Sequence, residues 1–311
     1  MPENHMFLPE GLRPPSVFTL ESLRLAAIQG SILEAPVQRC APDHCLQLSL
    51  GGIPGHISRN EAVAPWISGS DREISVLSRV GKQTCFTVIS VDSDEKGAPI
   101  AILSRRLAQE SAMNFLMKHL KPGMILTCLA TRIETFGVFA DIGCGIVAML
   151  PIEQISVARI QHPGERFREG QRFPAAVLSF DKDRRRIVLS HRELLGTWME
   201  NASRFTPGET VRGIVRSVKD YGAFVELAPN LSGLADYRAD VSTGDHVSVF
   251  IKSIRPERMK IKLQIVDKVT APVLPEPMRY QITDGTLTQW RYSPQNYERA
   301  PIETDFTASV L

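Results

Sequence analysis

The chain has 311 residues, enough for two or three domains of ordinary size. Its 36 basic and 34 acidic residues leave a net charge of +2, so composition excludes a strongly basic protein but allows local basic patches. The sequence has no apolar run near the ~20 residues of a membrane span and no signal-peptide pattern at its start, so we expect a cytoplasmic protein that binds no membrane. Its five cysteines form no CxxC pair and are predicted to be reduced, mostly buried thiols.

An internal repeat divides the chain into three units. The two clearest copies span residues 121–192 and 206–268, and a weaker copy spans residues 23–107. Two motifs recur at an offset of 85 residues: Pro122-Gly123 as Pro207-Gly208, and Phe136-Gly137-Val138-Phe139 as Tyr221-Gly222-Ala223-Phe224. Because matching motifs in the same order are hard to obtain by chance, we predict three copies of one fold.

The segments around the units differ from them in composition. We predict helical linkers at residues 108–120 and 193–205. Each linker is followed by the Pro-Gly pair at which the next unit begins. Residues 1–22 form an N-terminal segment. Residues 269–311 carry aromatic residues between prolines, so we expect an extended C-terminal segment that packs on the third unit or binds a partner.

Within a unit the pattern is that of β-structure. In the second unit, runs rich in valine, isoleucine, leucine, threonine and phenylalanine predict five strands, at about residues 123–133, 136–142, 146–150, 171–180 and 185–190. Five short strands in so few residues predict a small closed barrel, and the five-stranded OB barrel fits best. Its second and third strands form the usual ligand surface.

The sharpest functional feature is a pair of rings on either side of a glycine. Phe136 and Phe139 form the pair in the second unit, and Tyr221 and Phe224 form it in the third. Residues three apart on a regular strand point to opposite faces, but a bulge or sharp bend at the glycine would bring both rings to one face. Two exposed rings can stack on unpaired bases. The alternative is that one ring of each pair belongs to the core, which recurrence with Phe exchanged for Tyr disfavours.

Basic residues flank these rings along the chain. Such side chains can neutralise phosphates along a groove, although charged turns are more often simply solvated. The residues concerned are Arg132 and Arg184-Arg185-Arg186 in the second unit, and Arg216, Lys219, Arg258 and Lys260 in the third.

Taken together, these motifs resemble the S1 RNA-binding domain, an OB-fold module named after a small-subunit ribosomal protein. The resemblance to the short form of that bacterial family implies a mainly β protein of tandem five-stranded barrels joined by short helices. It implies RNA contacts from two rings and from charged residues around the last hairpin. The matching residues are Phe136, Phe139, Asp181 and Arg186 in the second unit, and Tyr221, Phe224 and Lys260 in the third.

The sequence departs from the family pattern in each unit. The family's histidine falls on Pro151 in the second unit and on Asp236 in the third. We expect the first unit to keep the histidine, as His56, but to lack the rings, whose positions fall on His44 to Gln47. The resemblance therefore implies that the first unit docks on protein rather than on RNA.

The resemblance implies a protein that binds single-stranded RNA, mRNA in particular, and works with the small (30S) ribosomal subunit in translation. We expect no enzyme activity, cofactor, metal or small-molecule substrate, since no catalytic or metal-binding motif stands out. The alternative is an adaptor or regulator in RNA decay or transcription that does not bind the ribosome stably.

Overall fold

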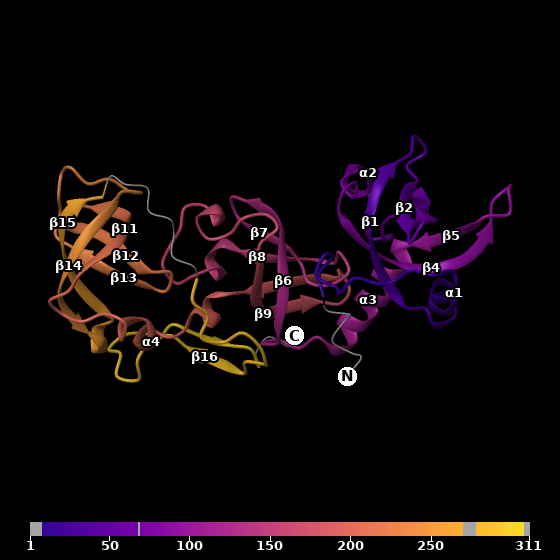
Figure 1. Ribbon diagram of the computed structural model, residues 1–311. Helices are drawn as coiled ribbons and strands as arrows, with labels where there is room; N and C mark the ends of the chain where they lie inside the picture. The colour runs from indigo at the N-terminus through magenta and orange to yellow at the C-terminus, as the bar shows by residue number, and fades with distance from the viewer. Residues whose placement is uncertain (1–7, 68, 270–277, 308–311) are drawn as a thin grey trace.

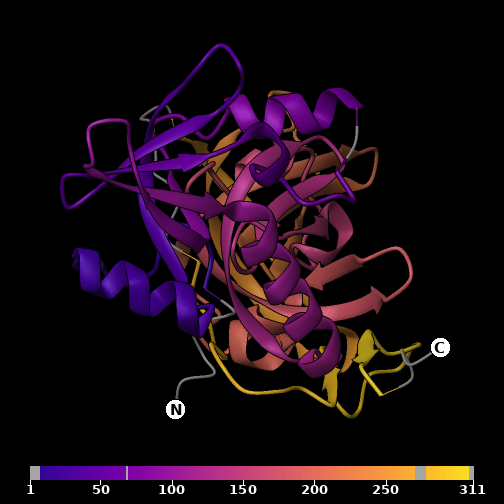
Figure 2. The same ribbon diagram turned by 90° about the vertical axis from the view of Figure 1, so that its right-hand side faces the viewer.

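The computed structural model describes residues 8–67, 69–269 and 278–307, so parts of the predicted terminal segments 1–22 and 269–311 lie outside the described residues. Three closed five-stranded barrels follow one another in a row (Figure 1). The end-on view in Figure 2 places helices α1 (Leu20–Gln29) and α2 (Gly69–Leu77) on different sides of the first barrel. The prediction of a mainly β protein built from tandem barrels is confirmed.

All three barrels have the same strand order, in which the third and fifth strands close the barrel as a parallel pair. Barrel one contains β1 (Ile32–Cys40), β2 (Leu46–Leu50), β3 (Ile53–Ile57), β4 (Gln83–Ser93) and β5 (Pro99–Ser104). Barrel two contains β6 (Ile125–Glu134), β7 (Gly137–Asp141), β8 (Val147–Pro151), β9 (Arg172–Asp181) and β10 (Arg186–Ser190). Barrel three contains β11 (Thr210–Lys219), β12 (Gly222–Ala228), β13 (Leu231–Ala235), β14 (His246–Arg255) and β15 (Lys260–Lys268).

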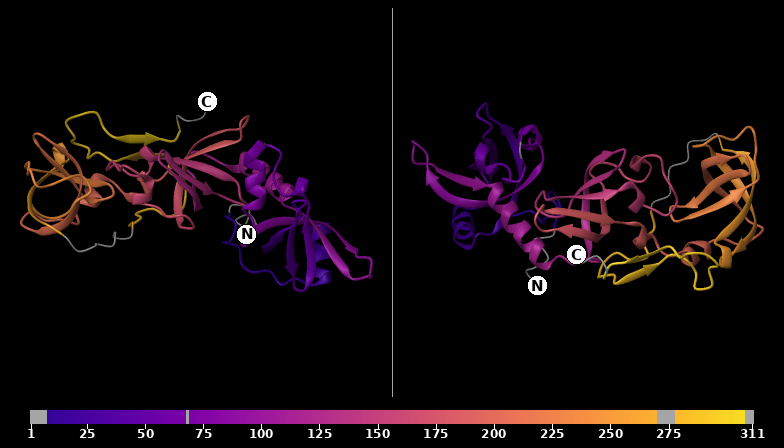
Figure 3. Two further views of the ribbon diagram at one scale, coloured as in Figure 1. Left: turned by 90° about the horizontal axis from the view of Figure 1, so that it is seen from above. Right: turned by 180° about the vertical axis from the view of Figure 1, so that it is seen from behind.

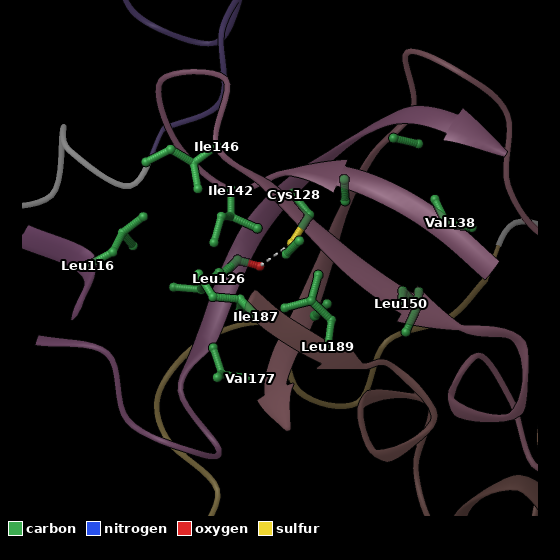
Figure 4. Packing of buried hydrophobic residues seen from close by; sticks show 14 of the residues in the cluster. Leu116, Leu126, Cys128, Val138, Ile142, Ile146, Leu150, Val177, Ile187 and Leu189 are labelled. Carbon is green, nitrogen blue, oxygen red and sulfur yellow. Dashed lines mark hydrogen bonds between the residues drawn. The ribbon is translucent and has the colours of Figure 1, made fainter. Parts of the chain in front are cut away.

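Alternation along the strands fills the barrel interiors. In barrel two, Val138, Leu150 and Leu189 point inward from neighbouring strands and are fully buried (Figure 4). The thiol of Cys128 joins them and donates to the Leu126 carbonyl at 3.7 Å. Burial raises the pKa of this thiol. All five cysteines are free, and three of them are buried, as predicted.

The two linkers have different structures. The first is helix α3 (Arg105–His119), which begins where the Ser104 hydroxyl accepts a hydrogen bond from Leu107 N at 2.9 Å. The second is not one helix: a 3-10 turn (Arg192–Leu195) is separated from the short helix α4 (Trp198–Ala202) by Gly196. Gly196 has φ +85° and ψ 171°, a conformation that interrupts a helix and that glycine adopts readily.

Buried ion pairs fix each barrel against the next. Between barrels one and two, the Glu10 carboxylate accepts from Arg105 at 2.9 Å, while its backbone N–H donates to Asp141 at 2.7 Å. Between barrels two and three, Glu226 accepts from Arg166 at 2.6 Å, and Arg216, which Glu226 also binds within barrel three, donates to Glu165 of barrel two. Breaking a buried ion pair is costly, so these contacts connect the three barrels into one row.

The C-terminal segment runs along barrels two and three (Figure 3). Leu287 N donates to the Gly123 carbonyl of barrel two at 2.9 Å, and the Tyr292 hydroxyl donates to the Asn230 carbonyl of barrel three. Strands β16 (Gln289–Arg291) and β17 (Glu303–Asp305) pair with each other within it. The segment was expected either to pack on the third unit or to bind a partner. Its described residues pack on the chain itself, against both barrel two and barrel three. In the described ranges, no helix is long and apolar enough to span a membrane.

Candidate nucleic-acid interface

Strand pairing builds a continuous row of outward-facing residues across barrel two. Residues that lie directly opposite each other on paired strands point to the same face of the sheet. Each residue of this row is directly opposite the next: Arg132, Phe139, Met149, Val188 and Ser179. None of the five is buried, whereas the neighbouring Val138 and Leu150 point into the core.

The two predicted rings of each unit lie together at this face. In barrel two, the centroids of Phe136 and Phe139 are 5.9 Å apart with the rings at 87°, and Phe136 is 51% exposed. In barrel three, the centroids of Tyr221 and Phe224 are 6.2 Å apart at 89°, and Tyr221 is 68% exposed. Both separations fit edge-to-face packing, which leaves the outer ring open to solvent.

The rings meet for a different reason from the predicted bulge at glycine. The register shift in barrel two lies on β6, between Ala130 and Arg132, and not at Gly137. Phe136 instead occupies the turn before β7, where strand alternation does not apply. Glycine is needed at position 137 because a Cβ there would lie 2.5 Å from the Leu150 carbonyl oxygen of the neighbouring strand. The expectation of a bulge at the glycine is therefore wrong, while the sharp bend is present.

The predicted charged residues of barrel two are partly dispersed. Arg132 is in the row and forms an ion pair with Glu134 at 2.5 Å. Arg186 and Asp181 are exposed and directly opposite each other, two strands from Phe139 along the barrel. Arg185 is engaged elsewhere, because its guanidinium lies 4.5 Å from the ring centroid of Trp66 in barrel one. The three arginines of the hairpin thus have different contacts, since Arg184 pairs with Asp181 at 3.8 Å.

The predicted cations of barrel three also divide into two groups. Lys219 and Lys260 are exposed and have no ion pair among the described residues. Arg258 forms an ion pair with Glu298 of the C-terminal segment at 3.2 Å. Arg216 is unavailable to RNA, because its side chain is only 12% exposed and is bonded to Glu226. The expectation that Arg216 flanks the rings as a phosphate ligand is wrong.

Lys262 is a further cation on the face of barrel three, and it was not predicted as a site residue. The row in this barrel consists of Ser217, Phe224, Leu234, Lys262 and Ser253. Lys262 is exposed and stands where barrel two has Val188. The signal was present in the alternation of Lys260-Ile261-Lys262-Leu263, which places both lysines on the outer face.

Barrel one has the same row without a phenylalanine, tyrosine or tryptophan. Its members are Arg39, Gln47, His56, Ile102 and Ser90. Gln47 thus corresponds to Phe139, and His44 corresponds to Phe136, as expected. His56 corresponds to Met149, however, and the counterpart of Pro151 is Ser58. The prediction that His56 occupies the family's histidine position is wrong. The strand register places His56 opposite Gln47, two residues before that position.

The rows offer stacking surfaces and cations rather than reactive groups. Among the residues that the structure describes, there is no cluster of three or more histidine, cysteine, aspartate or glutamate side chains that could hold a metal ion. The arrangement can therefore bind unpaired bases by their faces and phosphates by nearby charges.

Comparison with known proteins assigns this arrangement to a family. The S1 RNA binding domain model matches residues 120–192, which contain barrel two. The small ribosomal subunit protein bS1 homolog of Bacillus subtilis (strain 168) is 35% identical over 159 residues, covering 50% of this chain and 41% of that protein. The small ribosomal subunit protein bS1 of Neisseria meningitidis serogroup B is 30% identical and covers 68% of this chain and 40% of that protein.

A third relative extends the match. The small ribosomal subunit protein bS1 of Leuconostoc lactis is 31% identical, covering 69% of this chain and 53% of that protein. The chain spans about half the length of these relatives or less. Three tandem barrels, the match to the S1 RNA binding domain in the second and these relatives together support the assignment of the chain to the bacterial S1 protein family.

Proposed function

We propose that this chain binds single-stranded RNA by stacking unpaired bases on the ring pairs of barrels two and three. The observation that carries the proposal is the recurrence of one exposed and one half-exposed ring, edge to face, at the same place in two barrels. Each base stacked on an aromatic side chain contributes ~1–3 kcal/mol to binding. Exposed Lys219, Lys260, Lys262 and Arg186 supply charge for the phosphates between the bases.

Two connected barrels should bind one RNA more tightly than either alone. The ion pairs Arg166–Glu226 and Arg216–Glu165 hold barrel three against barrel two. Once a strand has stacked on one ring pair, its next segment is presented to the other at high effective concentration. A net charge of +2 is sufficient in this arrangement, because stacking supplies much of the affinity.

The test compares ring variants in the full chain. Phe136→Ala/Phe139→Ala and Tyr221→Ala/Phe224→Ala should each weaken binding of a fluorescently labelled single-stranded RNA by roughly tenfold or more. The control, Leu25→Ala/Ile28→Ala, removes exposed apolar side chains from α1 and should leave the affinity unchanged. Unchanged affinity in both ring variants would overturn the proposal.

We further propose that the chain works with the small ribosomal subunit in the cytoplasm, holding mRNA during translation. The named relatives, all small-subunit S1 proteins or homologues, support this step. Co-sedimentation with purified small subunits at low and high salt tests it. Binding to RNA without co-sedimentation at either salt concentration would instead favour an adaptor in RNA decay or transcription.

A further inference from the structure

Barrel one has a cleft where barrels two and three have their outer ring. His44, Arg59, Arg72, Glu73 and Val76 line it. Its volume is about 70 Å³, room for several water-sized groups, such as the oxygens of one phosphate. The cleft lies beside the row that continues through Gln47 and His56, so it belongs to the same face of the barrel as the ring pairs.

Two guanidinium groups line this cleft. Arg59 follows β3 in a 3-10 turn and is exposed, and Arg72 comes from α2 and is half-buried. Neither has an ion pair in the described part of the chain. This contrasts with Arg79 and Arg105 of the same barrel, which are both paired with Glu10. Guanidinium groups that converge on a cleft suit an oxyanion, because their paired N–H donors match two oxygens at once.

His44 adds a second observation. The Nδ1 atom of its ring is buried and has no hydrogen-bond partner among the described residues. A buried polar atom without a partner is unfavourable, and a ligand oxygen would relieve it. The Nε2 atom faces Glu73 at 3.6 Å. Among the described residues that line the cleft, Glu73 is the one acidic residue against two arginines, so these side chains carry a net positive charge.

We propose that this cleft binds a phosphate group of RNA, so that barrel one contributes charge to the interface where the other two barrels contribute stacking. The choice of RNA rests on the proposed function and on the shared barrel face, and it departs from the expectation that the first unit docks on protein. The phosphate is either the terminal monoester of a 5′ end, with three non-bridging oxygens, or an internal phosphodiester, with two, and either can present two oxygens to Arg59 and Arg72.

The experiment uses the full chain and calorimetric titration with three probes: a short single-stranded RNA with a 5′-phosphate, the same RNA with a 5′-hydroxyl, and inorganic phosphate. Arg59→Gln/Arg72→Gln should weaken binding of the phosphorylated RNA by roughly tenfold and abolish binding of inorganic phosphate. The matched control, Arg24→Gln/Lys82→Gln, removes two exposed charges of the same barrel and should change either affinity by less than about twofold. Arg59→Lys/Arg72→Lys, which keeps the charge but not the paired donors, should give an intermediate loss.

The outcomes distinguish a 5′ end from an internal phosphodiester, and they distinguish failure of this inference from failure of the proposed function. An equal loss for both RNAs assigns an internal phosphodiester, and a loss confined to the phosphorylated RNA assigns a 5′ end. Equal effects of the cleft and control variants on RNA affinity would overturn the inference. It would also be overturned if a hexaglutamate peptide, but not inorganic phosphate, competed with the RNA for binding. If RNA does not bind at all but inorganic phosphate binds through Arg59 and Arg72, the proposed function fails while the anion site stands. If the ring variants lose RNA and the cleft variant does not, only this inference fails.

Discussion

Lys262 of barrel three occupies the position that Val188 occupies in barrel two. Each lies in the last strand of its barrel, directly beside the residue that faces the inner ring, Leu234 or Met149. The two interfaces therefore share a geometry but carry their cation at different places: barrel two has Arg132 opposite its inner ring, where barrel three has Ser217. On the other side of the inner ring, barrel two has the apolar Met149 and Val188, while barrel three has Leu234 followed by the cation Lys262.

Exchanging these residues should exchange the salt dependence of RNA binding. For a single strand, each neutralised phosphate contributes a slope of about −0.7 to a plot of log affinity against log salt concentration. We expect Lys262→Val to make the slope for the full chain shallower by about 0.7, and Val188→Lys to make it steeper by about 0.7. Lys96→Val, in an exposed turn of barrel one, is the control and should not change the slope. Identical slopes for all four proteins would show that Lys262 contacts no phosphate.

Glycine at position 137 should be required for the ring pair. Gly137 has an ordinary backbone conformation, and a Cβ there would press on the Leu150 carbonyl. We expect Gly137→Ala to lower the free energy of unfolding by about 1–3 kcal/mol, since the backbone of β7 or β8 must shift. Urea denaturation measures the change.

The comparison variant is Gly170→Ala. Gly170 has φ +79° and open space around its Cα, so alanine there carries only the cost of a left-handed conformation, ~1 kcal/mol. A smaller loss for Gly137→Ala than for Gly170→Ala would mean that the close approach of β7 and β8 does not require glycine.

The sequence predicts the barrels well because their determinants are local. Alternation along each strand, the Pro-Gly openings and the repeat itself place every strand of barrel two within about two residues of its observed bounds. The rings are recognisable for the same reason, since both lie within four consecutive residues. Lys262 could also have been found by strand alternation alone.

What the sequence could not provide depends on contacts between distant parts of the chain. The burial of Arg216 follows from its ion pair with Glu226 and from the docking of barrel two, which no local pattern records. The stacking of Arg185 on Trp66 likewise joins two barrels. His56 was misplaced because a shift of two residues preserves alternation, so only the pairing with Gln47 fixes its register.

Glu226 should be a major contributor to the connection between barrels two and three. Its side chain is 5% exposed and accepts from Arg166 and Arg216, which are 6% and 12% exposed. Removing the carboxylate leaves the buried Arg166 guanidinium without its ion-pair partner and Arg216 with Glu165 alone, so we expect Glu226→Ala to lower the free energy of unfolding by about 3–5 kcal/mol. The exposed Glu169→Ala should change it by less than about 0.5 kcal/mol. Similar effects of the two variants in urea denaturation would contradict this role.

His191 should make the stability of the chain depend on pH. It is fully buried, with Nδ1 2.8 Å from the Ile155 carbonyl and Nε2 3.2 Å from the Tyr280 hydroxyl of the C-terminal segment. Burial lowers its pKa from 6.5 to about 4, because the charged ring loses solvation there. The neutral ring is therefore favoured in the folded state. Its contribution is complete above pH 6.5 and is lost as the pH falls towards 4.

The measurement is the free energy of unfolding between pH 7 and pH 4 for three proteins: the natural chain, His191→Gln and the exposed-histidine variant His119→Gln. The carboxylates titrate in all three, so only the difference between the curves reports on His191. Relative to His191→Gln, the natural chain should lose roughly 3 kcal/mol more over this interval, as expected for a depressed histidine pKa. His119→Gln should follow the natural chain. Parallel curves for the natural chain and His191→Gln would mean that the buried ring does not carry this linkage, and that the contact between barrel two and Tyr280 is insensitive to acid.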